Sequence, residues 1–245
     1  MAVIKNPEAI SEKLVADYRQ VFGDNLVAVI MYGSAVTSEY CPGKSDINLV
    51  VVLDDDSVSE IGKSVPIIHT WSKRRVAIPF FMSRTFIASA LDVYPVEFLD
   101  IRTNYRVLFG EDVFASLTLD NNNLRLQCER ELRGVAIHLR SAYVAAEGRS
   151  KVLAGLLEAS IKKLLPVYKA LLTLHGVPIP NHRAAIVAAI EQNVIPRSTI
   201  LMEVMNAVYG TSDKRSYVDL YNAYAQGIDA LITVIDSQSN ERVHV

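Results

Sequence analysis

The chain has 245 residues, of which half are hydrophobic and 21% are charged, and its formal net charge is −2. This composition is ordinary for a globular protein and argues against long disorder, and the length suffices for one large domain or two small ones. A net charge so close to zero gives no general attraction to anionic membranes or nucleic acid, so we do not expect a long nucleic acid as a partner.

The cysteines and the N-terminal segment indicate the cellular compartment in which the protein is expected. Cys41 and Cys128 lack the spacing of a metal site and are too few for a disulfide framework. The N-terminus lacks the charged and apolar regions of a signal peptide, and no apolar run approaches the roughly 20 residues that span a bilayer. We therefore predict a cytoplasmic protein without a membrane segment.

The first half of the chain alternates helical and strand patterns. A helix is predicted from Pro7 to Phe22, because Asn6 is a favourable N-cap and Gly23 a favourable stop. Several later apolar runs have the length of strands, and their lack of alternation indicates burial on both faces between layers of helices. The predicted strands are 26–32, 47–53, 77–82, 96–101 and 105–109, with helices at 57–75 and 84–91.

The second half has only helical patterns, beginning after a polar break at 120–123. One apolar face recurs at spacings of four and three, which indicates a core or a subunit interface. It comprises Cys128, Leu132, Val135, Leu139 and Ala142. Further helices are predicted at 151–175, 183–193, 198–209 and 216–236. We therefore predict an α/β (α+β) domain with a mixed sheet over residues 1–118, followed by an all-α helical bundle domain over residues 119–245.

The segment from 31 to 53 contains the residues best suited to chemistry. A buried strand ends in Gly33-Ser34, a loop of eleven residues follows, and Asp46 opens the next strand. A Gly-Ser turn can present backbone N–H donors to a phosphate without a blocking side chain. Asp46 and Asn48 are two residues apart on an extended chain and so leave the same face of the sheet. Their side-chain oxygens are ligands of the kind that Mg²⁺ prefers.

This segment resembles the signature of the polymerase-beta-type nucleotidyltransferase superfamily, which is an apolar strand, Gly-Ser, roughly ten residues and then Asp-x-Asp/Glu in an apolar strand. The layout of the chain is similar to that of the kanamycin nucleotidyltransferase-like antibiotic adenylyltransferases. The resemblance implies transfer of a nucleoside monophosphate from a Mg²⁺-bound nucleoside triphosphate, first of all ATP, to a hydroxyl of an acceptor that the sequence does not identify. It also implies a homodimer.

The resemblance assigns roles to individual residues, because the superfamily takes a third carboxylate from a later strand. The predicted nucleotide-binding residues are Gly33, Ser34, Lys44 and Ser45, the predicted metal ligands are Asp46, Asn48 and Glu97, and the catalytic acids among them are Asp46 and Glu97. Asp100 competes with Glu97 for the third position, although on a regular strand the two would point to opposite faces.

Other assignments stay open. The superfamily has an acid where this chain has Asn48, and an amide oxygen ligates Mg²⁺ without adding negative charge, so metal affinity and turnover should be lower. The alternative to an enzyme is therefore a degenerate, non-catalytic nucleotide-binding or antitoxin-like interaction protein. A third hypothesis is a different fold in which the spacing is chance. Glu129 and Glu158 are candidates for the general base. The basic run 73–75 is expected to favour a helix C-terminus and to face solvent.

Overall fold

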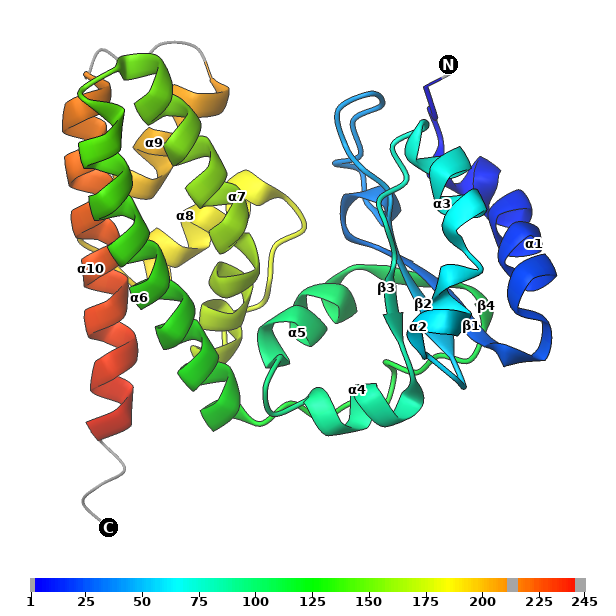
Figure 1. Cartoon of the computed structure of the whole chain (residues 1–245). Helices are drawn as coiled ribbons and strands as arrows, with labels where there is room; N and C mark the ends of the chain where they lie inside the picture. Colours follow the sequence, from blue (N-terminus) through cyan, green and yellow to red (C-terminus); the bar gives the residue numbers. More distant parts are fainter. Residues whose placement is uncertain (1–2, 211–215, 241–245) are drawn as a thin grey trace. The chain divides into compact units, whose positions relative to one another are not determined.

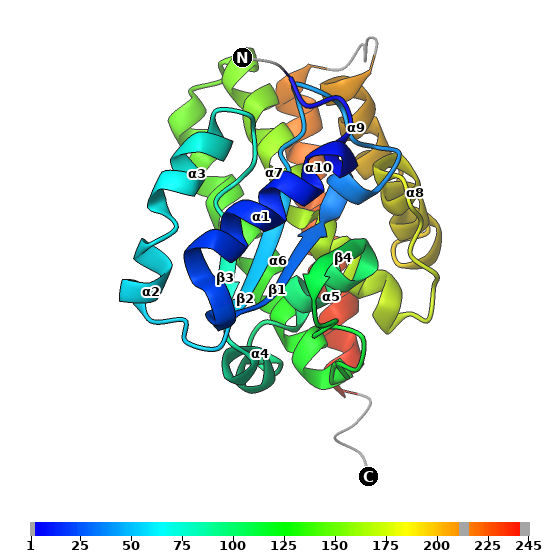
Figure 2. The same ribbon diagram turned by 90° about the vertical axis from the view of Figure 1, so that its right-hand side faces the viewer.

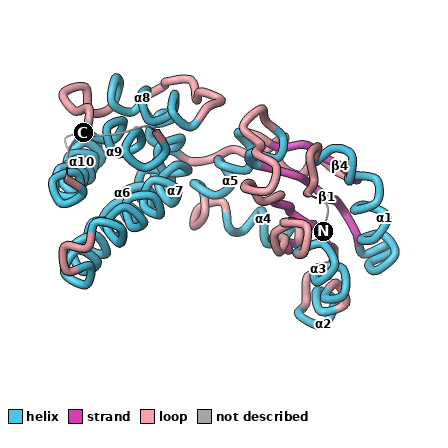
Figure 3. Tube along the Cα trace, turned by 90° about the horizontal axis from the view of Figure 1, so that it is seen from above, coloured by secondary structure: helices cyan, strands magenta, loops and turns pink. Residues whose placement is uncertain are grey.

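The apolar runs of the first half form a sheet. A computed structural model of the chain describes residues 3–210 and 216–240, and the chain divides into two compact units, Met1–Leu119 and Asp120–Val245 (Figure 1). The strands are β1 (Leu26–Tyr32), β2 (Asn48–Leu53), β3 (Phe80–Met82) and β4 (Tyr105–Gly110). Among the described residues, strands occur only in the N-terminal unit, where Figure 3 draws them in magenta.

The sheet is mixed, as predicted, and its strand order is β3-β2-β1-β4. β1 pairs antiparallel with both β2 and β4, whereas β3 runs parallel to β2. Tyr32, the last residue of β1, pairs with Asn48, the first residue of β2. The turn that follows β1 and the loop that precedes β2 therefore meet at one end of the sheet.

Helices cover both faces of the sheet. α1 (Ser11–Phe22), which follows a 3-10 turn at Pro7–Ile10, and α3 (Val65–Ser72) cover one face, and Figure 2 shows α1 crossing in front of the strands. A short helix, α2 (Val58–Gly62), precedes α3. α4 (Arg84–Ala90) and α5 (Pro95–Thr103) cover the other face. Successive residues of β2 alternate between the two cores, since Val51 belongs to the first and Val50 to the second.

One predicted strand is wrong. The segment 96–101 is helical and forms most of α5. Pro95 stands at the start of this helix, where its missing N–H costs nothing, Glu97 lies in its first turn, and Arg102 lies in its last. Val96, Phe98 and Ile101 are the buried side chains that give the segment its apolar, strand-like composition.

The second unit is helical where the structure describes it, in agreement with the predicted fold class. It consists of α6 (Asn121–Ala146), α7 (Ser150–Leu174), α8 (Arg183–Asn193), α9 (Ile200–Tyr209) and α10 (Tyr217–Asn240). The polar break is a helix start, because the Asp120 carboxylate accepts hydrogen bonds from the amides of Asn122 and Asn123. Cys128 is fully buried in the core beneath α6. No helix in the described part of the chain has the length and apolar character required to cross a membrane.

Candidate functional site

Gly33 and Asn48 are neighbours at one end of the sheet. Gly33 has a φ of 75°, which L-residues with a side chain rarely adopt, and it opens a 3-10 turn at Gly33–Val36. A Cβ built on Gly33 would lie 3.4 Å from Nδ2 of Asn48. The turn and the start of β2, which the signature places together in sequence, are therefore neighbours in space.

Hydrogen bonds already hold part of this turn. The Gly33 amide donates to the carbonyl of Asn104 at 2.8 Å, and the Thr37 amide donates to the carbonyl of Ser34 at 3.0 Å. The Thr37 hydroxyl donates to the same Ser34 carbonyl at 3.1 Å. Since the Gly33 N–H is occupied, the phosphate contacts predicted for this turn fall on Ser34.

Asp46 lies at the end of the loop before β2, with 56% of its side chain exposed. Oδ1 of Asp46 is 2.9 Å from Nη2 of Arg75, and the same guanidinium donates to the carbonyls of Lys44 and Ser45. The Ser45 hydroxyl in turn accepts a hydrogen bond from the Cys41 amide at 3.0 Å. Arg75 is exposed beyond the end of α3, as expected, and its guanidinium also binds the loop that carries three of the predicted site residues.

The acids of α5 have a different geometry from the one predicted. Glu97 is exposed in the first turn of the helix, and Asp100 follows three residues later. On a helix this spacing places two side chains on neighbouring parts of one face, not on opposite faces. The pKa of Tyr32 is raised by burial and secondarily by the negative charge of Asp100. Asp100 is thus the α5 acid that acts on a residue paired with Asn48.

β3, the edge strand that pairs with β2, and the residues just before it contain no carboxylate. β3 and the residues before it read Ala-Ile-Pro-Phe-Phe-Met over 77–82, and the ring of Phe80 stacks against Tyr32 with centroids 6.3 Å apart. Within the described ranges, no three His, Cys, Asp or Glu residues form a cluster that could hold a metal ion. The candidate metal donors at the start of β2 are the Asp46 carboxylate, in the preceding loop, and the Asn48 amide beside Gly33. This set fits one nucleotide-bound Mg²⁺, which often uses only one or two protein carboxylates, and does not fit a two-metal centre.

The predicted general bases of the helical unit are both in ion pairs. Glu129 accepts hydrogen bonds from Arg133 at 2.8 Å and from Arg125 at 3.0 Å, and these bonds, that of Arg133 first, lower its pKa. A lowered pKa makes a carboxylate a weaker base. Glu158 is 2.7 Å from Nζ of Lys162 on the surface of α7. Neither residue has the environment of a general base.

The helical unit contains a groove of about 210 Å³ between α6, α7 and α10. Most of the residues that line it are apolar, and the polar ones are His138, Ser160, Lys163 and Tyr221. The hydroxyl of Tyr221 donates to the Leu139 carbonyl at 2.8 Å, and Ser160 shares a hydrogen bond with Tyr224 at 2.9 Å. These hydroxyls are used within the core, so the groove presents chiefly apolar surface.

Taken together, a mixed four-stranded sheet between helices and a following helical bundle define a fold of the nucleotidyltransferase type, similar to that of the kanamycin nucleotidyltransferase-like enzymes. Among solved structures, the chain is similar to spectinomycin adenyltransferase AAD(9) from Enterococcus faecialis, crystallised with ATP and spectinomycin. The TM-score is 0.55 at 12% sequence identity, and the alignment covers 92% of this chain and 99% of that chain. Neither the known protein families nor the curated proteins yield a match. The predicted resemblance is confirmed at the level of the fold.

Proposed function

We propose that the chain is a nucleotidyltransferase that binds a nucleoside triphosphate, first of all ATP, and transfers a nucleoside monophosphate to a hydroxyl of an acceptor. The observation that carries this proposal is the pairing of Tyr32 with Asn48, which brings the Gly33 turn after β1 and the Asp46 loop before β2 to one end of the sheet. The fold similarity to an adenyltransferase crystallised with ATP makes ATP the first nucleotide to test.

The roles of the residues follow from their chemistry. Ser34 would contact the phosphates, with Lys44 as a nearby positive charge, and Asp46 and Asn48 would hold a Mg²⁺ ion. When bound, that ion would neutralise negative charge on the phosphates. In the reaction, the acceptor oxygen forms a bond to the α-phosphorus, the bond to the bridging oxygen breaks, and pyrophosphate leaves in line. The proton of the attacking hydroxyl must pass to a base, and the carboxylates of Glu97 and Asp100 on α5 are the candidates.

A second candidate is a nucleotide-binding protein without turnover. Three features favour it: the amide at position 48, the ion pair that occupies Asp46, and the absence of a carboxylate on 77–82. Each feature reduces the negative charge that a catalytic metal site needs. Both candidates predict ATP binding, and they differ in whether a nucleotide is consumed.

Calorimetric titration of ATP, with and without Mg²⁺, tests the binding site. We expect binding by the wild type that weakens in Ser34→Ala and loses its Mg²⁺ dependence in Asp46→Ala. Ser38→Ala is the matched control, since it removes a hydroxyl four residues along the same loop. A wild type that binds no common nucleoside triphosphate would refute both candidates.

Transfer itself is measured with ATP labelled at the α-phosphate, against a panel of hydroxyl-bearing acceptors that includes aminoglycosides, protein and RNA ends. Pyrophosphate release with label on the acceptor would establish the enzyme. Binding without release of pyrophosphate under any of these conditions would favour the second candidate.

A further inference from the structure

A cationic side chain occupies the carboxylate that the proposed metal site requires. Arg75 follows α3, and its guanidinium contacts three consecutive residues of the loop before β2. Nη2 donates to the Lys44 carbonyl at 2.6 Å and lies 2.9 Å from Oδ1 of Asp46, and Nε donates to the Ser45 carbonyl at 3.4 Å. These contacts hold the guanidinium against the loop that carries Asp46.

The backbone of Arg75 is tied to the same loop. Its φ of 64° lies in the left-handed region, which is uncommon for a residue with a β-carbon. The Arg75 carbonyl accepts a hydrogen bond from the Ile47 amide, and the Ala77 amide donates to the Ile47 carbonyl, each at 2.9 Å. A sparsely populated conformation persists where its surroundings over-determine it, and these two bonds, which flank Val76, fix the backbone that follows Arg75. The guanidinium is therefore part of the loop structure rather than an independent surface side chain.

The charges around Asp46 set up a competition. A divalent cation bound to Asp46 would stand within a few ångströms of the guanidinium, and two positive charges at that separation repel. Asn48, the next candidate ligand, contributes no negative charge that would offset this repulsion. A divalent cation and the Arg75 guanidinium therefore compete for the Asp46 carboxylate.

We propose that Arg75 is a positioning residue that competes with Mg²⁺ for Asp46 and keeps the affinity of the site for free divalent cations low. A bound nucleotide would shift this competition, because its phosphates supply ligands to the metal and anionic partners to a guanidinium. The inference rests on the proposed function, since it takes Asp46 as a metal ligand. It adds that Arg75 lowers the affinity of the nucleotide-free site for a divalent cation.

The test is a titration with Mn²⁺, followed by the electron paramagnetic resonance signal of the free ion, on the whole chain without nucleotide. Arg75→Gln should bind Mn²⁺ about two- to fivefold more tightly than the wild type, which is the range expected on releasing a half-exposed ion pair. Arg75→Lys retains the charge and should stay close to the wild type. Arg74→Gln is the matched control, because it removes the adjacent charge, which lies 5.2 Å from the Trp71 ring centroid, and leaves the ion pair in place.

The double variant Arg75→Gln/Asp46→Asn should lose the gain in Mn²⁺ affinity that Arg75→Gln shows. The proposal is overturned if Arg75→Gln, with a wild-type circular dichroism spectrum, binds Mn²⁺ no more tightly than the wild type, or if the gain survives in the double variant. Neither ATP nor turnover enters this measurement. A chain that transfers no nucleotide can still show the gain, so failure of the proposed function and failure of this inference give different results.

Discussion

At the scale of single residues, the amide at position 48 sets how much negative charge the proposed metal site can offer. Its side chain is half-buried beside the Gly33 turn, two residues after Asp46. An aspartate of the same shape would add a second carboxylate at the position where the superfamily signature has an acid. Replacing the Asn48 amide by a carboxylate would add one negative charge and leave the side-chain volume nearly unchanged.

Asn48→Asp should therefore strengthen the Mg²⁺ dependence of ATP binding, by on the order of tenfold in the apparent Mg²⁺ affinity of the ATP complex. Titration of Mg²⁺ at fixed ATP measures this. Asn193→Asp, which adds the same charge to an exposed position of α8, is the control for net charge. Equal effects of the two substitutions would mean that position 48 is not a metal ligand.

The sequence suggests candidate site residues, and it misses one of their contacts for a physical reason. Gly33, Ser34 and Asp46 could be proposed because they stand at the end of one buried strand and just before the next, and β1 and β2 pair so that these ends meet. Arg75 was missed because its contact with Asp46 joins residues 29 positions apart and depends on a left-handed backbone at a non-glycine residue. Neither feature leaves a pattern in composition or periodicity.

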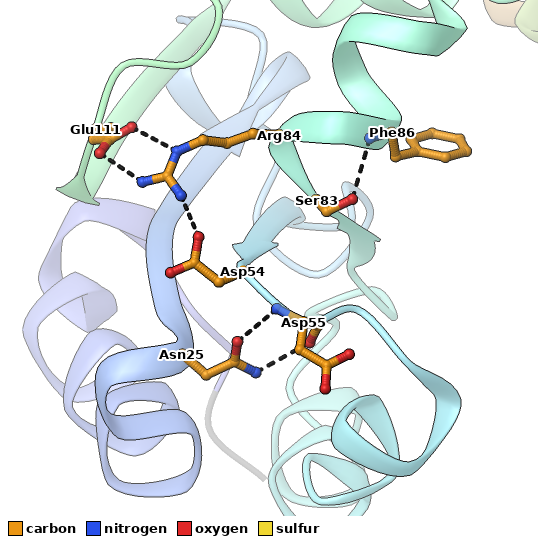
Figure 4. A network of polar contacts seen from close by, with 7 residues as sticks. All are labelled: Asn25, Asp54, Asp55, Ser83, Arg84, Phe86 and Glu111. Atoms are coloured by element: carbon orange, nitrogen blue, oxygen red, sulfur yellow. Dashed lines mark hydrogen bonds and ion pairs between the residues drawn. The ribbon is translucent and has the colours of Figure 1, made fainter.

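At the scale of elements, the far end of the sheet is held by a polar network (Figure 4). Arg84 at the start of α4 forms ion pairs with Asp54, just past β2, and with Glu111, just past β4, the latter at 2.6 Å. Asn25 accepts from the Asp55 amide at 2.7 Å and donates to its carbonyl at 3.0 Å. Because β1 and β2 are antiparallel, this network lies at the opposite end of the strands from Gly33 and fastens their loops without entering the candidate site.

This network predicts a pH dependence. Arg84, first through its hydrogen bonds, lowers the pKa of Glu111 in the folded state. The resulting stabilisation is present in full above the unfolded pKa of about 4.3 and is lost as pH falls through the folded value. The gap in melting temperature between wild type and Arg84→Gln should therefore narrow from about pH 5 to about pH 3. In a Glu111→Gln background the gap should vary less with pH; an unchanged variation would assign it to another group.

Gly110 fixes the pairing of β4 with β1. It has a φ of 78°, and a Cβ there would lie 1.8 Å from the carbonyl oxygen of Val27. Gly110→Ala should lower the free energy of unfolding by about 2–3 kcal/mol, because it combines backbone strain with a clash against backbone. Gly62→Ala, with nothing within 4 Å of the added methyl group, should change it by less than about 1 kcal/mol. Urea unfolding compares the two, and equal costs would contradict the argument.

The elements differ in how far their sequences determine them. β1 and β2 are buried on both faces, so their apolar runs predict them directly. The segment of α5 is also apolar, and a short apolar run does not by itself distinguish a buried strand from a buried helix. Pro95 followed by an acid in the first turn was the signal for a helix, and the prediction gave it too little weight.

At the scale of the whole molecule, the similarity to AAD(9) extends over 92% of this chain and so includes parts of both units. At 12% identity, such agreement reflects the pattern of buried positions more than shared side chains. Function in such a fold depends on individual side chains, and at most aligned positions these differ between the two chains.

Each unit has its own core, and Glu191 allows their energetics to be separated. It is 7% exposed, and its carboxylate accepts hydrogen bonds from the amides of Leu201 at 2.7 Å and Met202 at 3.1 Å, which joins α8 to the first turn of α9. Glu191→Ala would leave one buried and one half-buried amide donor unpaired and should cost about 2 kcal/mol of unfolding free energy. Glu191→Gln keeps an acceptor oxygen and should cost less, since burial already raises the pKa of this carboxyl and disfavours its charge.

If nucleotide is held by the N-terminal unit alone, ATP affinity at 25 °C should stay within about twofold of the wild type in Glu191→Ala, even though its melting temperature falls by several degrees. Calorimetric titration and thermal unfolding monitored by circular dichroism measure the two effects on one sample. Unchanged affinity would confine the nucleotide site to the sheet. A loss of affinity that Glu191→Gln does not share would mean that the packing of α8 against α9 contributes to binding, and the helical unit would then hold part of the nucleotide site.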